Sequence, residues 1–338
     1  MDICVCGAQV PFTRGGAELL MENLVAAFEG AGHRAELVRL PVAWEPERLF
    51  DAAVAWRLLP LDADVVVAIN FPSYFVNHQR KVVWLAHQHR GAYDGFGAPW
   101  SGMGYDDRSL EIQRQLVDWD TRALEEATAR FTISGVVADR LQRFNGLAAT
   151  PLYHPPPLDD RLLTGPYGDY VFCASRLADN KRPQLLVEAL ATSTSGTRVV
   201  LAGTGPLRDS LLADARRLGV DDRLDMPGFV DDGALVRHFA SALAVVYAPY
   251  DEDYGYVTLQ AFRAAKPVIT AKDSGGVLEW VEDGVNGIVT DGTGAGIAEA
   301  IDRLAGDPAL ARRMGEAGRA RLGDLSWGPV VDTLLGAR

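Results

Sequence analysis

Strand-sized apolar runs alternate with helix-patterned segments along most of this chain, and that alternation limits its fold more than any other feature. Val65–Ile69 and Val82–Ala86 are almost continuously apolar, as parallel strands covered on both faces must be. Near the start, the run Ile3–Gly7 is followed by apolar residues at four-residue spacing from Leu20 to Phe28, and then by a second strand-like run. We therefore predict an α/β fold that opens with a βαβ unit.

The alternation stops once, at four prolines within Pro151–Pro157. Proline cannot pair inside a sheet or continue a helix, so this segment is the expected linker. A chain of 338 residues is also too long for one ordinary core. We predict two Rossmann-like doubly wound domains facing a cleft, residues 1–155 and 156–325, and a last helix within residues 326–338 that can return to the first domain. The strands expected in the second domain are Tyr170–Ala174, Arg198–Ala202, Arg223–Met226, Ala244–Ala248, Val268–Ala271 and Ile288–Thr290, and Val277–Glu282 is expected to be a helix.

The charge balance excludes several classes of function. Asp and Glu outnumber Lys and Arg by 45 to 33, for a net charge of −12, so we expect no general affinity for nucleic acids or anionic membranes. Cys4, Cys6 and Cys173 are expected to be reduced core residues. The sequence shows neither a signal-peptide pattern nor an apolar run of the roughly 18 residues that span a membrane. We therefore expect a cytoplasmic protein without an integral membrane segment, either free or peripheral at a membrane.

An acidic loop and a helix start follow the expected strand that ends at Ala248. Glu252 lies in the loop, and Gly255, Tyr256 and Val257 open the helix, whose unpaired amides and positive dipole end favour an anion. Gln260 lies one turn further along, so its amide and the Glu252 carboxylate can face the same ligand. The alternative interpretation is a solvated acidic loop before an ordinary helix.

Cations and glycines mark two other strand-to-helix turns. Arg176 and Lys181 follow the strand that starts the second domain, where the pair can clamp a diphosphate, unless both simply face solvent. Gly15 and Gly16 lie in the first turn of the chain, where their backbone can approach a phosphate closely. The turn lacks the G-x-G-x-x-G pattern, which disfavours a nicotinamide enzyme.

A polar cluster, His87-Gln-His-Arg, follows the strand that ends at Ala86. At the carboxyl end of a strand His87 can contact a ligand, although a lone histidine is as often just a satisfied polar residue. A metal is not expected there, because no third ligand accompanies the two histidines. Asp251-Glu-Asp contains the Asp-x-Asp pattern of some metal-dependent transferases, but Arg176 and Lys181 already supply positive charge. We therefore expect neither a metal nor a cofactor.

Taken together, these segments resemble the retaining glycosyltransferases of family 4, which have the two-domain GT-B architecture. The resemblance covers most of the chain and is strongest in four ordered motifs of the second half. These motifs are Ser175-Arg-Leu-Ala-Asp-Asn-Lys-Arg, Leu201-Ala-Gly-Thr-Gly-Pro, Asp251-Glu-Asp-Tyr-Gly-Tyr-Val-Thr-Leu-Gln-Ala and Ser274-Gly-Gly-Val-Leu-Glu-Trp-Val-Glu-Asp-Gly-Val-Asn-Gly. The resemblance implies a hexosyltransferase of carbohydrate biosynthesis with a nucleotide-diphosphate sugar as co-substrate.

The resemblance also implies a role for each matched residue. Arg176 and Lys181 bind the donor diphosphate, Glu252 contacts hydroxyls of the transferred sugar, and Gln260 stands where the family usually has a glutamate that holds the ribose. Gln260 can still accept one hydrogen bond and donate another, but the charged acceptor is lost. The remaining matched residues contact phosphate or sugar: His87, Gly15, Gly16, Gly255, Tyr256, Val257, Ser274, Gly275 and Gly276. Family behaviour implies retention, with the leaving phosphate taking the acceptor proton.

Three other interpretations stay open. A nucleotide-sugar epimerase of the same architecture converts its donor without an acceptor, and an inactive relative, suggested by Gln260, binds nucleotide without turnover. A dehydrogenase is the most distant. The sequence identifies neither the base nor the sugar of the donor, and the acceptor can be a sugar, a lipid-linked sugar or a small molecule. We expect loops such as Ala92–Asp107 to recognise it.

Overall fold

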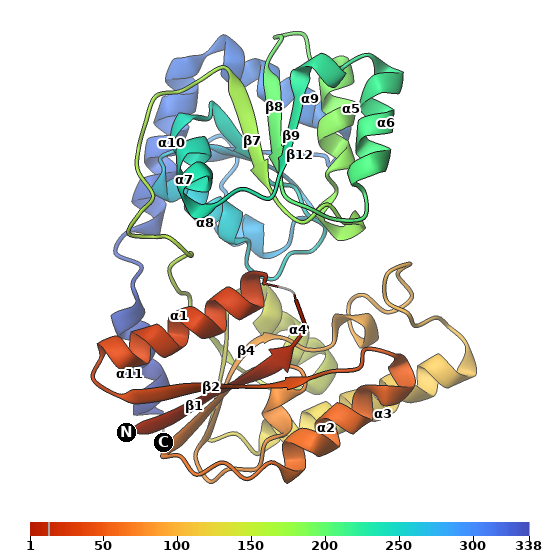
Figure 1. The fold of residues 1–338 in the computed structure, drawn as a ribbon, viewed down its shortest axis with the longest axis vertical. Coiled ribbons are helices and arrows are strands. Elements are labelled where there is room, and N and C mark those ends of the chain that lie inside the picture. Colours follow the sequence, from red (N-terminus) through yellow and green to blue (C-terminus); the bar gives the residue numbers. More distant parts are fainter. Residues whose placement is uncertain (13, 338) are drawn as a thin grey trace. The chain divides into compact units, whose positions relative to one another are not determined.

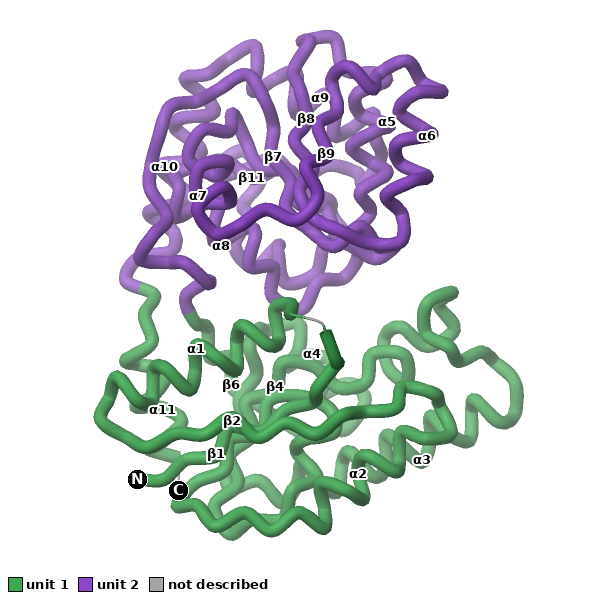
Figure 2. The backbone as a smooth tube through the Cα atoms, viewed as in Figure 1, with its two compact units in different colours: residues 1–154, 325–338 green, residues 155–324 purple. Residues whose placement is uncertain are grey.

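The computed structural model describes residues 1–12 and 14–337, which divide into two compact units. Unit 1 contains residues 1–154 together with residues 325–338, and unit 2 contains residues 155–324 (Figure 2). Each unit is built around a six-stranded parallel sheet, so the α/β fold with two Rossmann-like domains is confirmed.

The sheet of unit 1 has the strand order β2-β1-β3-β4-β5-β6. Every described residue of β3 is buried, which explains its continuous apolar sequence. The order reverses direction at β1 and β3, so the loops after these strands flank the switch point where ligands bind in such sheets. The strands are β1 (Asp2–Gln9), β2 (Arg34–Pro41), β3 (Val65–Asn70), β4 (Lys81–His87), β5 (Ala129–Thr132) and β6 (Thr150–Pro151).

Helices cover both faces of this sheet (Figure 1). Leu20, Leu24 and Phe28 form the buried face of α1, as their spacing predicts. The C-terminal helix α11 lies against α1 and buries Val330, Val331 and Leu334 within unit 1. The helices of unit 1 are α1 (Gly16–Gly30), α2 (Leu49–Leu58), α3 (Asp107–Glu125), α4 (Gly135–Asn145) and α11 (Trp327–Gly336), with 3-10 turns η1 (Pro46–Arg48), η2 (Ser73–Phe75) and η3 (Arg90–Ala92).

The sheet of unit 2 has the order β12-β11-β10-β7-β8-β9, with its switch point between β7 and β10. Helices α5, α6 and α9 lie on one face, and α7, α8 and α10 on the other (Figure 1). The strands are β7 (Tyr170–Ala174), β8 (Arg198–Ala202), β9 (Leu224–Gly228), β10 (Ala244–Val246), β11 (Val268–Ala271) and β12 (Gly287–Thr290). The helices are α5 (Gln184–Thr192), α6 (Arg208–Leu218), α7 (Asp232–Ser241), α8 (Tyr256–Arg263), α9 (Gly294–Gly306) and α10 (Pro308–Leu322), with 3-10 turns η4 (Asp179–Lys181), η5 (Asp221–Arg223) and η6 (Gly276–Glu279).

Two local expectations were wrong. Pro151 belongs to β6, which pairs only with β5, because an edge strand tolerates a proline that donates no hydrogen bond. Instead of a helix over Val277–Glu282, the chain forms the short turn η6, because glycines precede it and Gly284 follows it closely. Among the described residues, no helix combines the length and apolar character needed to cross a bilayer.

Candidate functional site

Lys181 and Glu252 meet at the carboxyl edge of the sheet in unit 2. Lys181 ends η4 in the loop after β7, Glu252 lies in the loop after β10, and β7 and β10 are paired neighbours. The Lys181 ammonium forms an ion pair and hydrogen bond with Glu252 Oε2. The two side chains are only 21% and 18% exposed, so the pair lies in a partly dry environment where charge interactions are strong. The topology thus brings together the cation and the carboxylate that the sequence singled out separately.

Tyr247 completes this cluster, and the sequence analysis missed it. Its buried hydroxyl donates to Glu252 Oε2 over 2.8 Å and lies 3.4 Å from the Lys181 ammonium. Burial, reinforced by the Glu252 charge, raises the pKa of Tyr247 well above its ordinary value, so the hydroxyl remains a donor. Its place at the end of a buried strand was the available signal, but an apolar strand end looks like ordinary core.

Arg182, also missed, ties three strand-end loops together. Its guanidinium donates to the carbonyls of Ala248 and Pro249 at 2.9 Å each. It also forms a bidentate pair with Asp273 at 2.7 and 2.9 Å. Such planar, two-pronged pairing fixes geometry as well as charge, so the loops after β7, β10 and β11 are held in register.

Arg176, predicted beside Lys181, is exposed. Within residues 1–12 and 14–337, its guanidinium has no ion pair or hydrogen bond. It lies in the same loop as Lys181, which leaves it available to an anion at this edge.

The Ser274–Gly276 segment supports the Glu252 loop. The Ser274 amide donates to Ala271 and the Gly276 amide to the Glu252 carbonyl at 2.7 Å, so these two amides have protein partners instead of pointing at a ligand as expected. Gly275 has φ 60°, and a Cβ there would lie 2.6 Å from the Glu252 carbonyl oxygen. Only glycine lets the two backbones approach this closely.

Helix α8 starts beside this cluster, as predicted. Gly255 is the N-cap, with φ 82°, and no side chain caps the helix. Because the first amides of a helix have no acceptor within it, the Tyr256–Val257 end retains anion-binding character. Gln260 differs from the expectation: it is buried, and its Nε2 donates to the Pro157 carbonyl over 3.1 Å. One of its two amide N–H donors is thus committed to the backbone, and the oxygen and the second N–H are left for a ligand.

The predicted residues of unit 1 lie at the carboxyl edge of their own sheet. His87 ends β4, half-buried, and its Nδ1 must donate to the Gln88 carbonyl at 2.9 Å because a carbonyl only accepts. Gly15 caps α1, with its amide bound to the Glu18 carboxylate at 2.9 Å, and Gly16 is the first residue of the helix. His89 stacks on Trp44 with ring centroids 5.7 Å apart, and burial followed by the neighbouring His87 lowers its pKa to about 4. His89 is therefore neutral at physiological pH.

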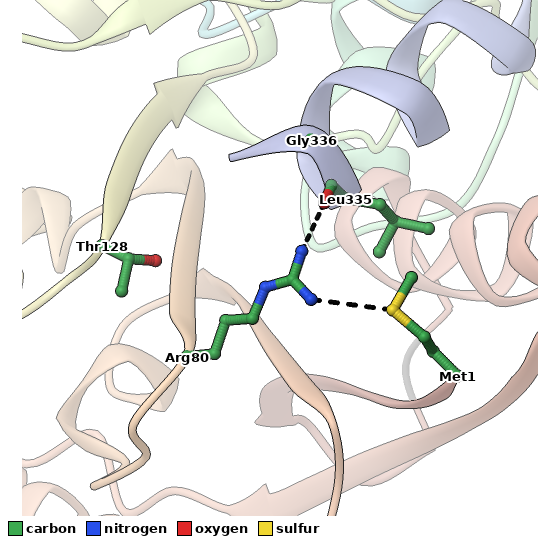
Figure 3. A pocket seen from close by; sticks show the side chains of 5 residues that line it. All are labelled: Met1, Arg80, Thr128, Leu335 and Gly336. Atoms are coloured by element: carbon green, nitrogen blue, oxygen red, sulfur yellow. Dashed lines mark hydrogen bonds between the residues drawn. The ribbon is translucent and has the colours of Figure 1, made fainter. Parts of the chain in front are cut away.

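Other features of the described residues do not compete with these sites. No cluster of three or more His, Cys, Asp or Glu side chains there could hold a metal ion. One pocket, of about 710 Å³, is lined by Met1, Arg80, Thr128, Leu335 and Gly336 (Figure 3). Met1, Arg80 and Thr128 directly precede β1, β4 and β5, so the pocket lies at the opposite edge of the sheet from His87, which ends β4. Its Arg80 guanidinium donates to the Leu335 carbonyl and so is committed to the end of α11.

Comparison with known proteins relates the chain to sugar-transferring enzymes. Residues 165–321, almost all of unit 2, match the family model described as glycosyl transferases group 1. The chain is 28% identical over 360 residues to a GDP-mannose-dependent alpha-(1-6)-phosphatidylinositol monomannoside mannosyltransferase of Mycobacterium tuberculosis, covering 91% of this chain and 90% of the relative.

Solved structures share the fold over the whole chain. The sucrose-phosphate synthase of Thermosynechococcus elongatus superposes with a TM-score of 0.77 at 17% identity, covering 100% of both chains. Anabaena HepE in complex with UDP and glucose superposes with a TM-score of 0.73 at 19% identity, covering 99% of this chain and 100% of the other.

Proposed function

We propose that this chain, which has the GT-B fold and whose residues 165–321 match the family model of glycosyl transferases group 1, is an enzyme that moves a hexosyl group from a nucleotide-diphosphate sugar to an acceptor hydroxyl. Unit 2 binds the donor and unit 1 the acceptor. The observation that carries the proposal is the cluster of Lys181, Glu252 and Tyr247 at the switch point of unit 2, beside the uncapped start of α8.

The donor diphosphate binds to the two cations of the loop after β7. Lys181 leaves Glu252 for the phosphate oxygens, Arg176 adds its guanidinium, and the amides at Gly255 to Val257 complete the anion site. The Glu252 carboxylate oxygens then accept hydrogen bonds from hydroxyls of the transferred sugar. They do not bind the diphosphate, because phosphate oxygens are also acceptors. An anion supplied by the substrate thus replaces the internal ion pair.

The rest of the donor site is built from backbone and amide groups. Gln260 accepts a hydrogen bond from a ribose hydroxyl through its oxygen, while one of its N–H groups stays bound to the Pro157 carbonyl. Ser274, Gly275 and Gly276 shape the site by holding the Glu252 backbone. In unit 1, Gly15 and Gly16 approach the donor phosphates and His87 the donor sugar, as the family resemblance implies.

The reaction is metal-independent and retaining. The bond between the anomeric carbon and the diphosphate breaks as the acceptor oxygen bonds the same carbon from the same face, and the acceptor proton goes to the departing phosphate oxygen. The barrier depends on neutralising charge on that leaving group, and Lys181, Arg176 and the α8 amides supply the positive charge and hydrogen-bond donors for this. No side chain is required as a dedicated base.

The setting of the reaction follows from two observations. The described cysteines, Cys4, Cys6 and Cys173, are free thiols, which fits a reducing compartment such as the cytoplasm. The mycobacterial relative is named for a phosphatidylinositol-linked mannoside acceptor. A lipid-linked sugar at the membrane surface is therefore the first acceptor to test, ahead of free sugars and small molecules.

The test is a thermal-shift screen of UDP-glucose, GDP-mannose and ADP-glucose, followed by transfer assays with the sugar that stabilises the protein most. We expect one donor to raise the Tm and to yield a glycosylated acceptor. Conversion of that donor without any acceptor would instead identify an epimerase. Absence of a shift with all nucleotide sugars would refute the proposal.

A further inference from the structure

Tyr247 is the buried, neutral member of the cluster of Lys181, Glu252 and Tyr247, and it contacts both charged groups. Its hydroxyl lies 2.8 Å from Glu252 Oε2 and 3.4 Å from the Lys181 ammonium. The same ammonium lies 5.9 Å from the centre of the Tyr247 ring. The side chain is only 5% exposed, so solvent does not compete for the hydroxyl.

A phenol has one proton to donate, and the geometry shows where it goes. The Lys181 ammonium has only donors, so Tyr247 cannot donate to it and must accept from it. Its own proton therefore points at the Glu252 carboxylate. This hydrogen bond is charge-assisted and stronger than one between neutral groups.

Glu252 thus has two partners of different character. Lys181 has a flexible side chain, and in the proposed reaction its ammonium binds the diphosphate. The ring of Tyr247, directly after β10, is buried and packed, so its hydroxyl cannot follow a departing ligand. Once Lys181 has turned to the phosphates, Tyr247 remains to fix the carboxylate.

We propose that Tyr247 is a positioning residue for donor-sugar recognition: its hydroxyl holds the Glu252 carboxylate in place for the hydroxyls of the transferred sugar. The inference rests on the proposed function. It predicts that Tyr247 matters for the sugar part of the donor and not for its nucleoside diphosphate part.

Tyr247→Phe isolates the hydroxyl, because the ring and its packing remain. The matched control is Tyr170→Phe, in the same unit, where the hydroxyl donates to the His238 carbonyl at the amino end of β7, the edge opposite the cluster. Calorimetric titration of GDP-mannose against GDP, and of UDP-glucose against UDP, compares donors with and without the sugar. The Tm of each variant checks folding.

In Tyr247→Phe we expect Kd to rise about 5- to 20-fold for the nucleotide sugar that the wild type binds, and to stay within about twofold for its nucleoside diphosphate. Tyr170→Phe should leave both values within about twofold. In a Glu252→Ala background, adding Tyr247→Phe should change neither value, since no carboxylate is left to hold.

Three outcomes would overturn the inference. An equal rise in the Kd values of nucleotide sugar and nucleoside diphosphate would mean that the hydroxyl acts on Lys181 or on folding. An unchanged Kd for the nucleotide sugar would mean that the hydroxyl does not contribute to donor binding. A further loss in the Glu252→Ala background means that it acts independently of Glu252. Failure of the wild type to bind any nucleotide, or full GDP and UDP affinity in Lys181→Ala, would instead contradict the proposed donor site itself.

Discussion

Lys181 is the residue on which the proposed chemistry depends most. Its ammonium already has an anionic partner in Glu252, which shows that the pocket can hold the lysine charge beside a carboxylate. Lys181→Ala should remove one positive charge that neutralises the leaving group and cost about 2 to 4 kcal/mol of transition-state stabilisation. Steady-state kinetics should therefore show a fall in kcat/KM of about 30- to 1000-fold. Exposed Arg216→Ala on α6 is the control, and near wild-type turnover in Lys181→Ala would contradict the assignment.

Asp120 on α3 predicts a pH dependence of stability in unit 1. It is fully buried and accepts a hydrogen bond from the Tyr93 hydroxyl at 2.5 Å, and burial raises its pKa to about 7. Because this value lies above that of the unfolded chain, about 3.9, the folded state holds the proton more tightly between roughly pH 4 and 7. The contribution of Asp120 to the free energy of unfolding therefore decreases as the pH rises through this window and is constant above it.

Asp120→Asn removes the titration and keeps an oxygen that can accept from Tyr93. The free energy of unfolding of the variant, relative to wild type, should increase by about 1 to 3 kcal/mol from pH 5 to pH 8. Urea denaturation of unit 1 at the two pH values measures this. Asp118→Asn, at an exposed position of the same helix, should show no such trend. A pH-independent difference for Asp120→Asn would show that Asp120 does not titrate in this range.

The sequence could identify residues whose chemistry is unusual for their position. Lys181 and Glu252 stand out because charged groups follow buried strands, and the structure brings them together. Tyr247 and Arg182 could not be found this way, because their role depends on which loops the fold places side by side. The orientation of Gln260 was missed for the same reason, since its partner, Pro157, is remote in sequence.

The two loops that carry the donor cluster are held together by glycine at a close backbone approach. At Gly275, a side chain would combine an unfavourable positive φ with a Cβ 2.6 Å from the Glu252 carbonyl oxygen. Gly275→Ala should therefore destabilise unit 2 by about 2 to 3 kcal/mol and displace Glu252, lowering nucleotide-sugar affinity. Thermal unfolding and donor titration measure the two effects.

Gly306→Ala is the matched control for that variant. Gly306 ends α9 in the same unit, and a Cβ there would contact nothing within 4 Å. Its Tm should stay within a few degrees of wild type. If Gly275→Ala had as little effect as Gly306→Ala, the backbone at Gly275 and the backbone at Glu252 could move apart at little cost. Gly275 would then not be required for the position of Glu252.

At the scale of elements, strongly patterned segments were predictable and weakly patterned ones were not. The buried strands β3, β4, β7 and β8 match their predicted ranges within a residue or two, because apolar runs of that length fit few alternatives. The amphipathic α3 was missed, since its mostly polar sequence reads as surface loop until its one buried stripe is known. Short turns such as η6 depend on neighbouring loops and carry little local signal.

At the scale of the molecule, α11 makes unit 1 discontinuous in sequence. Leu334 is fully buried where α11 packs on α1, so Leu334→Ala should lower the free energy of unfolding of unit 1 by about 2 to 4 kcal/mol. Limited proteolysis and thermal unfolding should show the loss in unit 1 and not in unit 2. Leu58→Ala, at a position 76% exposed in the same unit, should change little. Equal effects of the two substitutions would mean that α11 contributes no core to unit 1.

The order of the strands in each sheet could not be predicted from the alternation of strand-like and helix-like segments. The alternation predicts parallel sheets, but it is compatible with several orders, and the position of each switch point follows only from the pairing of β1 with β3 and of β7 with β10. Those pairings decide which loops meet. Site residues are therefore predictable as candidates and become a site only through the topology.

The placement of α11 has a consequence for synthesis on the ribosome. All of residues 155–324 emerge before α11, the helix that packs on α1 and belongs to the same unit as residues 1–154. The N-terminal half must therefore wait for Val330, Val331 and Leu334 of α11 before its core is complete, while the later half already has every segment it needs. Nascent chains of this protein should complete the later half first, and stalled ones should be good clients for chaperones that bind exposed apolar surface.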